Sequence, residues 1–148
     1  MLFRSHRSIG EVTWEALWPR RVISSGSVPN NASTVLVVTV RGRTFLLSGD
    51  IETEAQVALA PDLRRFRFDA VKVPHHGSSH VSPLLPQWAP ARVALISVGV
   101  DNDYGHPASS TLEQWRSAGA MVVRTDESGD IAIEDGPDGS LRLAVHAP

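Results

Sequence analysis

The chain has 148 residues, of which 42% are hydrophobic and 20% charged, a composition typical of one globular domain with a sizeable core. Its formal net charge is −2 and it has no cysteine, so a disulfide scaffold and a thiolate metal site are both excluded. No apolar run approaches the roughly 18 residues of a membrane span, and the N-terminus has no apolar segment of a secretory signal. We therefore expect one soluble domain over residues 1–148, with residues 1–10 poorly defined.

The charge is distributed unevenly along the chain. Residues 1–43 carry six arginines against Glu11 and Glu15, whereas residues 44–148 are acidic. The basic third could face a polyanion, although an ordinary solvated surface is the simpler interpretation. The acidic balance of the whole chain argues against a dedicated nucleic-acid-binding module, but not against an enzyme that acts on phosphodiesters at a metal.

The first half of the chain predicts strands followed by a helix. Residues 11–18 form one expected strand, and residues 34–40 and 44–47 form a hairpin around Arg41-Gly42-Arg43. Asp50 follows this hairpin and precedes a predicted helix over residues 51–60, which Pro61 should end. Asp50 is therefore either the N-cap of the helix or a carboxylate ligand at a strand end, and its position alone favours the cap.

A short buried strand through Val71 and Val73 should stop at Pro74, which has no backbone donor. His75, His76, Gly77, Ser78 and Ser79 follow it. Adjacent side chains of an extended segment point opposite ways, so one histidine can face a metal while the other supports it. Ser78 and Ser79 can donate to an oxyanion or phosphate. A polar surface loop is the alternative.

The second half repeats the pattern of helix, strand and polar loop. A helix over residues 83–88 and a strand over residues 92–98 lead into a loop that holds His106. A helix to Ala118 follows, with Ser110 and Glu113 as a capping box and Gly119 after its end. Strands are expected over residues 120–124, 131–134 and 141–145, the last two as an antiparallel edge.

Neighbouring parallel strands place the polar clusters at one edge of the sheet. The order strand, Asp50, helix, strand, His75-His76 indicates a βαβ unit, whose crossover is almost always right-handed. We therefore predict that Asp50, His75 and His106 converge in one cleft. His6, His80 and His146 are interpreted as structural or surface residues. The expected core consists of Val35, Val37, Leu46, Val71, Val73, Val93, Leu95 and Val122.

Four segments together resemble the C-terminal metallo-β-lactamase-like domain of ComEC-type DNA-uptake (competence) proteins, over about residues 10 to 135. They are Pro29-Asn-Asn-Ala-Ser-Thr-Val-Leu, Phe45-Leu-Leu-Ser-Gly-Asp-Ile-Glu, Val71-Lys-Val-Pro-His-His-Gly-Ser and Ile96-Ser-Val-Gly-Val-Asp-Asn-Asp-Tyr-Gly-His-Pro. The resemblance implies an α/β fold, an αββα sandwich of which this chain is the C-terminal half or a partial domain. It also implies one or two metals, often zinc or manganese, between the two sheets.

By this resemblance Asp50 binds or bridges metal, and one of His75 and His76, with His75 favoured, is a histidine ligand. His106 contacts the scissile phosphate or acts as general acid. The chain departs from the family at Asn31 and Ser33, where related proteins often carry another histidine. It also lacks the upstream first metal motif, His-x-Asp-x-Asp-His or similar, which suggests a fragment or a truncated product.

The resemblance favours part of a metal-dependent hydrolase, a phosphodiesterase or nuclease acting on single- or double-stranded DNA. The partner it implies is the membrane channel domain of the same protein, so the parent would be membrane-associated; no small-molecule cofactor is expected. The alternatives are an inactive remnant or binding module with the same fold, and another hydrolase of that fold. With about half of the usual ligands, this chain alone is expected to be inactive.

Overall fold

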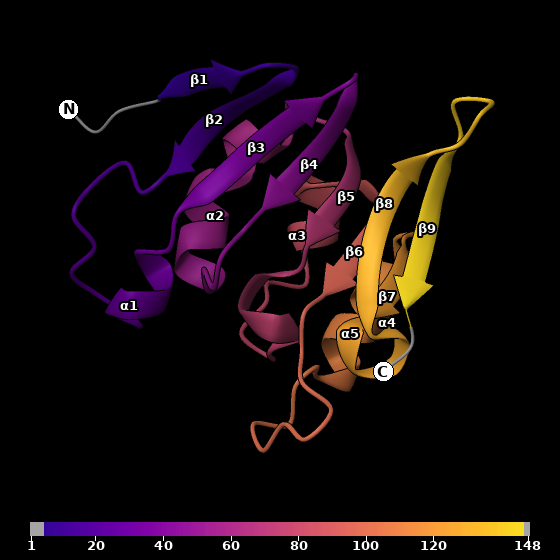
Figure 1. Ribbon diagram of the computed structural model, residues 1–148. Helices are drawn as coiled ribbons and strands as arrows, with labels where there is room; N and C mark the ends of the chain where they lie inside the picture. The colour runs from indigo at the N-terminus through magenta and orange to yellow at the C-terminus, as the bar shows by residue number, and fades with distance from the viewer. Residues whose placement is uncertain (1–4, 147–148) are drawn as a thin grey trace.

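The computed structural model describes residues 5–146, whose strands form two sheets (Figure 1). The larger sheet has seven strands that lie side by side in chain order. They are β1 (His6–Ile9), β2 (Val12–Trp18), β3 (Val35–Val40), β4 (Arg43–Leu47), β5 (Phe68–Lys72), β6 (Ala91–Ile96) and β7 (Met121–Arg124). No helix within residues 5–146 is long and apolar enough to cross a membrane.

The sheet is antiparallel from β1 to β4 and parallel from β4 to β7. The predicted hairpin of β3 and β4 is confirmed, and its turn is made by Arg41 and Gly42 at φ 49° and 77°. The predicted βαβ unit is confirmed as well, because β4 and β5 are parallel neighbours. Strand β1 was not expected, since three of its four residues are polar and all four are exposed.

Three helices connect the parallel strands and pack on one face of the sheet (Figure 1). They are α2 (Thr53–Leu63), α3 (Leu85–Trp88) and α4 (Ser109–Ser117). The core lies between them and the sheet, and includes Trp115, Leu59 and Leu85. The remaining short helices are α1 (Val28–Asn31) and α5 (Thr125–Ser128), expected to be loop or turn, and η1 (Pro74–Gly77), where an extended strand end was expected.

Most of the expected core is confirmed. Val35, Val37, Leu46, Val71, Val73 and Val93 are buried, whereas Leu95 and Val122 are only half-buried. Leu95 pairs with Lys72, on the face opposite the helices, and Val122 lies on the edge strand β7.

Two details of the helices were predicted wrongly. Helix α2 continues through Pro61 to Leu63, because only the last turn follows the proline and the lost hydrogen bond is a single one. Helix α4 has no capping box: its N-cap is Ala108, and Glu113 instead accepts a hydrogen bond from the Ser117 hydroxyl. Gly119 does follow the end of α4, at φ +86°.

The last two strands, β8 (Asp130–Asp135) and β9 (Leu141–His146), form a separate two-stranded sheet rather than an edge of the main one. This hairpin lies on the face of the main sheet that the helices leave free (Figure 1). Arg43 on β4 holds it there by donating to the Asp135 carboxylate at 2.8 Å and to the Gly139 carbonyl at 2.5 Å.

Adjacent residues of β4 provide a test of which sheet face carries the stability. Leu46 is 1% exposed beneath the helices, whereas Leu47 is 46% exposed on the other face. We expect Leu46→Ala to lower the free energy of unfolding by about 2–5 kcal/mol, because it opens a cavity, and Leu47→Ala to change it by less than about 1 kcal/mol. Urea denaturation measures both. Equal losses would contradict the assignment of the two faces.

Candidate functional site

Three loops meet at the carboxyl ends of β4, β5 and β6. Two glycines permit the close approach. A Cβ on Gly49 would lie 2.6 Å from Ser33 Cβ, and a Cβ on Gly77 would lie 2.7 Å from Pro107 Cβ. The Ala108 N–H donates to the Gly77 carbonyl at 2.9 Å. A side chain at Gly49 would push the loop after β4 away from Ser33, which precedes β3, and one at Gly77 would push apart the loops after β5 and β6, so the site depends on both glycines.

The histidine pair does not continue the strand as expected. His75 and His76 both adopt left-handed conformations, at φ 47° and 52°, inside the turn η1. Such backbone is unfavourable for residues other than glycine and persists only where its surroundings impose it. Here the His75 N–H donates to the Gly49 carbonyl at 3.3 Å, and the Ser78 N–H donates to the His75 carbonyl at 2.9 Å. The two imidazoles still diverge, but a turn separates them rather than strand alternation.

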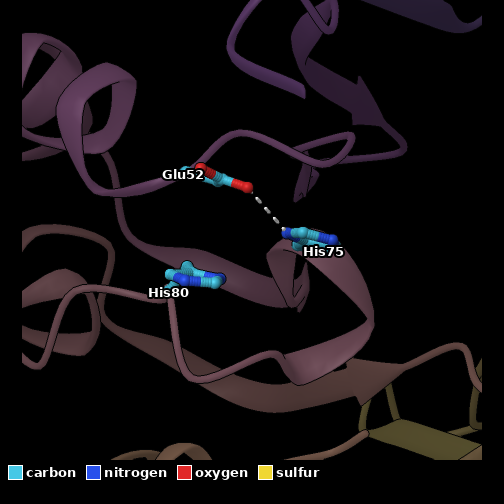
Figure 2. A group of neighbouring side chains, drawn as sticks. All are labelled: Glu52, His75 and His80. Carbon is cyan, nitrogen blue, oxygen red and sulfur yellow. Dashed lines mark ion pairs between the residues drawn. The ribbon is translucent and has the colours of Figure 1, made fainter. Parts of the chain in front are cut away.

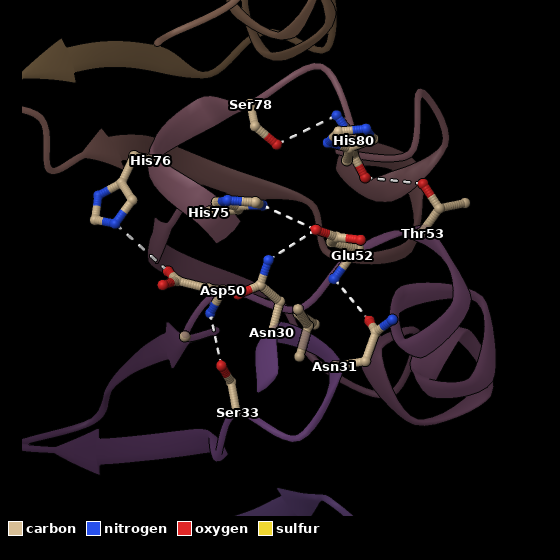
Figure 3. Close-up of polar contacts among 12 residues, drawn as sticks. Asn30, Asn31, Ser33, Asp50, Glu52, Thr53, His75, His76, Ser78 and His80 are labelled. Carbon is tan, nitrogen blue, oxygen red and sulfur yellow. Dashed lines mark hydrogen bonds and ion pairs between the residues drawn. The ribbon is translucent and has the colours of Figure 1, made fainter. Parts of the chain in front are cut away.

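Asp50 is not the helix cap that its position favoured. The N-cap of α2 is Glu52, two residues later. The Asp50 side chain instead faces His76 (Figure 3) and Lys72. Lys72 Nζ lies 3.2 Å from Asp50 Oδ1. Partial burial alone would raise the pKa of Asp50, but the charge and hydrogen bond of Lys72, with smaller effects of His76 and His75, hold it below 3.8. Asp50 is therefore a carboxylate at neutral pH.

His76 is oriented as a ligand. Its Nδ1 lies 2.6 Å from the Ser97 carbonyl, which can only accept, so Nδ1 carries the proton. Its Nε2 then presents a lone pair and lies 3.7 Å from Asp50 Oδ1. A backbone carbonyl that fixes the tautomer in this way is the usual support of a metal-binding histidine.

A second group lies on the other side of η1. Glu52, His75 and His80 present ligand atoms that all lie within 4.8 Å of one another (Figure 2). Glu52 was not among the residues predicted from the sequence, and His80 was interpreted as a structural or surface residue. A signal was available for Glu52, since it lies in the same strand-end loop as Asp50. Nothing in the sequence placed His80 against His75.

His106 joins the site from the loop after β6. Its ring centroid lies 5.5 Å from that of His75, so Asp50, His75 and His106 do gather at one edge of the sheet, as predicted. His106 and His76 also line a pocket of about 330 Å³ together with Asn102 and Tyr104. Asn102 holds this loop, because its amide donates to the His106 carbonyl and its Oδ1 accepts from the Tyr104 N–H.

The remaining candidate residues differ in accessibility. The Ser78 side chain is buried and accepts a hydrogen bond from the His80 N–H at 3.2 Å, whereas Ser79 is exposed. Asn31 and Ser33 support the loop backbone: Asn31 Oδ1 accepts from the Glu52 N–H and Ser33 Oγ accepts from the Asp50 N–H (Figure 3). Of Ser78 and Ser79, only the exposed Ser79 can contact a ligand without rearrangement.

Comparison with known proteins identifies relatives of this arrangement. No family model matches the chain. ComE operon protein 3 of Bacillus subtilis (strain 168) is 35% identical over 104 residues, which cover 69% of this chain and 13% of the relative. Competence protein ComA of Neisseria gonorrhoeae is 32% identical over 122 residues, 79% of this chain and 18% of the relative. The chain is a homologue of part of the ComEC-type competence proteins. The uncharacterized protein YcaI of Escherichia coli (strain K12) is 30% identical over 122 residues, 81% of this chain and 16% of the relative.

A solved structure shows the same fold as this ComEC-type homologue. It is a proposed metal-dependent hydrolase from Parabacteroides distasonis, with a TM-score of 0.53 and 13% sequence identity, and the match covers 83% of this chain and 55% of the other. At this identity the likeness concerns the fold alone. The α/β fold expected from the sequence is thereby confirmed.

The surroundings of His106 predict that its imidazole has a lowered pKa. Partial burial, with weaker repulsion from His75, His76 and His80, lowers its pKa below 6.5. The unfolded chain then binds more protons between the folded and unfolded pKa values, so stability rises with pH through that window and reaches its full value above about 6.5. We expect the His106 ring to titrate below pH 6.5 in a ¹H NMR titration. A titration midpoint at or above pH 6.5 would contradict this.

Proposed function

We propose that this chain is part of a metal-dependent hydrolase that cleaves phosphodiester bonds of DNA, within a competence protein of the ComEC type. One arrangement carries the proposal: ionised Asp50 faces the free Nε2 of His76, next to His106 and its pocket. Two of the relatives are a competence protein and a ComE operon protein by name, which supports a role in competence. DNA as substrate and a membrane channel domain of the same protein as partner are part of the proposal.

The Asp50–His76 pair fits a divalent metal. Zinc binds imidazole nitrogen and carboxylate oxygen at about 2.0–2.2 Å, so two of its tetrahedral ligands lie roughly 3.4 Å apart. The two atoms here are 3.7 Å apart, and Asp50 accepts a hydrogen bond from Lys72 on the same oxygen. Manganese also suits this mixture of carboxylate and imidazole. We infer Asp50 and His76 as ligands; His75, also predicted as a ligand, turns its Nδ1 toward Glu52 (Figure 2).

A metal held there would polarise a phosphoryl oxygen and lower the pKa of its bound water toward neutrality. The residues of the chain do the rest. Lys72, fixed by the Gly49 carbonyl at 2.8 Å, keeps Asp50 ionised. His106, with its lowered pKa, is neutral at pH 7 and can accept a proton. A phosphate anion beside it would favour the protonated imidazolium. Exposed Ser79 can donate to the same phosphate.

One observation favours a second candidate, a non-catalytic binding module. Asp50 already has a cationic partner, because Lys72 Nζ lies 3.2 Å from its carboxylate. A carboxylate paired in this way can be stable without a metal. In addition, Asp50 and His76 are two ligands where hydrolytic zinc sites use three protein ligands and a water. The Asp50–His76 pair alone should therefore bind metal weakly, and we propose that its further ligands come from the rest of a longer parent.

The test is cleavage of labelled single- and double-stranded DNA with added Mn²⁺ or Zn²⁺. We expect little or no turnover by the 148-residue chain, because about half of the ligands are absent. In a longer parent chain that supplies the first metal motif, we expect turnover that Asp50→Ala or His76→Ala lowers at least about 100-fold. His75→Ala tests the remaining predicted ligand.

Asp130→Ala, which removes an exposed carboxylate on β8, serves as control and should keep full activity. Robust turnover by the short chain, abolished by Asp50→Ala, would show that its site is complete. No turnover in the longer protein under any metal would support the binding module instead.

A further inference from the structure

The Glu52 carboxylate is nearly buried without a permanent cation. Its side chain is 14% exposed. Oε1 accepts a hydrogen bond from the Asn30 amide at 2.8 Å and lies 3.3 Å from His75 Nδ1 (Figure 3). Within residues 5–146 it forms no ion pair with a lysine or arginine, which distinguishes it from Asp50 with its Lys72. Burying a carboxylate is costly unless a cation or several donors compensate it.

The His75 imidazole faces this carboxylate with an unsatisfied nitrogen. Nδ1 has no solvent access and no partner in hydrogen-bonding geometry, although Glu52 Oε1 is close. A buried nitrogen without a partner is uncommon and costs free energy. The left-handed backbone of His75, at φ 47°, sets the direction in which this ring points. Glu52 Oε1 is within ion-pair distance of Nδ1 but outside hydrogen-bonding geometry, and a cation bound to both atoms would satisfy both.

His80 completes the group from a third segment. Its ring stacks on that of His75, with centroids 6.3 Å apart and an angle of 20° between the planes. Two hydrogen bonds fix its backbone: the Thr53 hydroxyl donates to the His80 carbonyl at 2.8 Å, and the His80 N–H donates to Ser78 Oγ at 3.2 Å. Thr53 is the neighbour of Glu52, so the carboxylate and His80 are tied to each other. The exposed His80 side chain leaves room for a solvent molecule.

We propose that Glu52, His75 through Nδ1, and His80 bind a divalent cation of the zinc class, at a site separate from the Asp50–His76 pair. Two imidazoles and one carboxylate are a ligand set that zinc, cobalt and manganese accept, with an open position for water. The ligand atoms lie within 4.8 Å of one another, so modest rotation of exposed His80 suffices to close the site. Asn30 and Asn31 orient Glu52 from α1, the outer support that such sites use.

The experiment measures cation binding rather than activity, so it does not depend on the hydrolase proposal. Zn²⁺ is titrated into the 148-residue chain by isothermal calorimetry, and long-range ¹H–¹⁵N spectra of the imidazoles report which ring nitrogens respond. We expect the His75 Nδ1 and His80 resonances to shift on binding. Glu52→Gln keeps the acceptor for Asn30 but removes the charge, and His80→Ala removes an exposed side chain. Each should weaken Zn²⁺ binding at least about tenfold.

Matched controls are Glu54→Gln, on an exposed residue of the same helix, and His146→Ala, on the exposed end of β9. Both should bind like the parent chain, and so should Asp50→Asn, which disables only the other pair. Unchanged affinity in both Glu52→Gln and His80→Ala, or unmoved His75 and His80 resonances, would overturn the proposal. Equal loss in Asp50→Asn would overturn the separateness of the two sites. If Glu52→Gln fails to fold, His80→Ala decides alone.

Discussion

The close contact of three strand-end loops is the constraint on which the site depends. Parallel pairing brings the ends of β4, β5 and β6 to one edge, but backbone atoms must then approach closely. Gly49 against Ser33 and Gly77 against Pro107 make that approach possible. The left-handed turn at His75 and His76 is a consequence, because the chain must reverse within one turn between the Gly49 and Gly77 contacts. As a result of this turn, the His76 imidazole faces Asp50 and the His75 imidazole faces Glu52.

The two carboxylates of this edge are compensated in different ways. Asp50 is half-exposed and has Lys72 beside it, so it is ionised and stable without a metal. Glu52 is more deeply buried, and among residues 5–146 its oxygens have Asn30 and His75 as their polar partners, while His75 Nδ1 stays unsatisfied. A cation entering at Asp50 must share the carboxylate with Lys72, whereas in the described part of the chain no lysine or arginine pairs with Glu52. This edge of the sheet therefore carries one carboxylate that is paired with a lysine, Asp50, and one that is paired with neither lysine nor arginine among the described residues, Glu52.

The sequence predicted the parallel half of the sheet and the gathering of Asp50, His75 and His106, because apolar periodicity and strand-end polarity are local signals. It did not predict details that depend on tertiary contacts. The left-handed turn replaced an extended strand end because Gly77 packs against Pro107, thirty residues away in the chain. Glu52 reads as the first turn of a helix, and His80 as surface, until folding stacks His80 on His75. The separation of β8 and β9 from the sheet follows from Arg43, whose partners Asp135 and Gly139 are equally remote in sequence.

The two faces of the large sheet are covered unequally. This difference is relevant to the Asp50–His76 site, which has only two of the ligands proposed for its metal. Helices α2, α3 and α4 bury Val35, Leu46 and Val71 on one face. On the other face the β8–β9 hairpin covers only part, and Leu36, Val38 and Phe45 remain half-buried. An αββα sandwich places a second sheet there, and the first metal motif of the family belongs to that half by resemblance. The relatives are five or more times longer than the matched segment, since the match spans 13% to 18% of them. Under the proposed function, residues of a longer parent chain would bury this half-exposed face and complete the Asp50–His76 site together, while the Glu52–His75–His80 group uses residues of this chain alone.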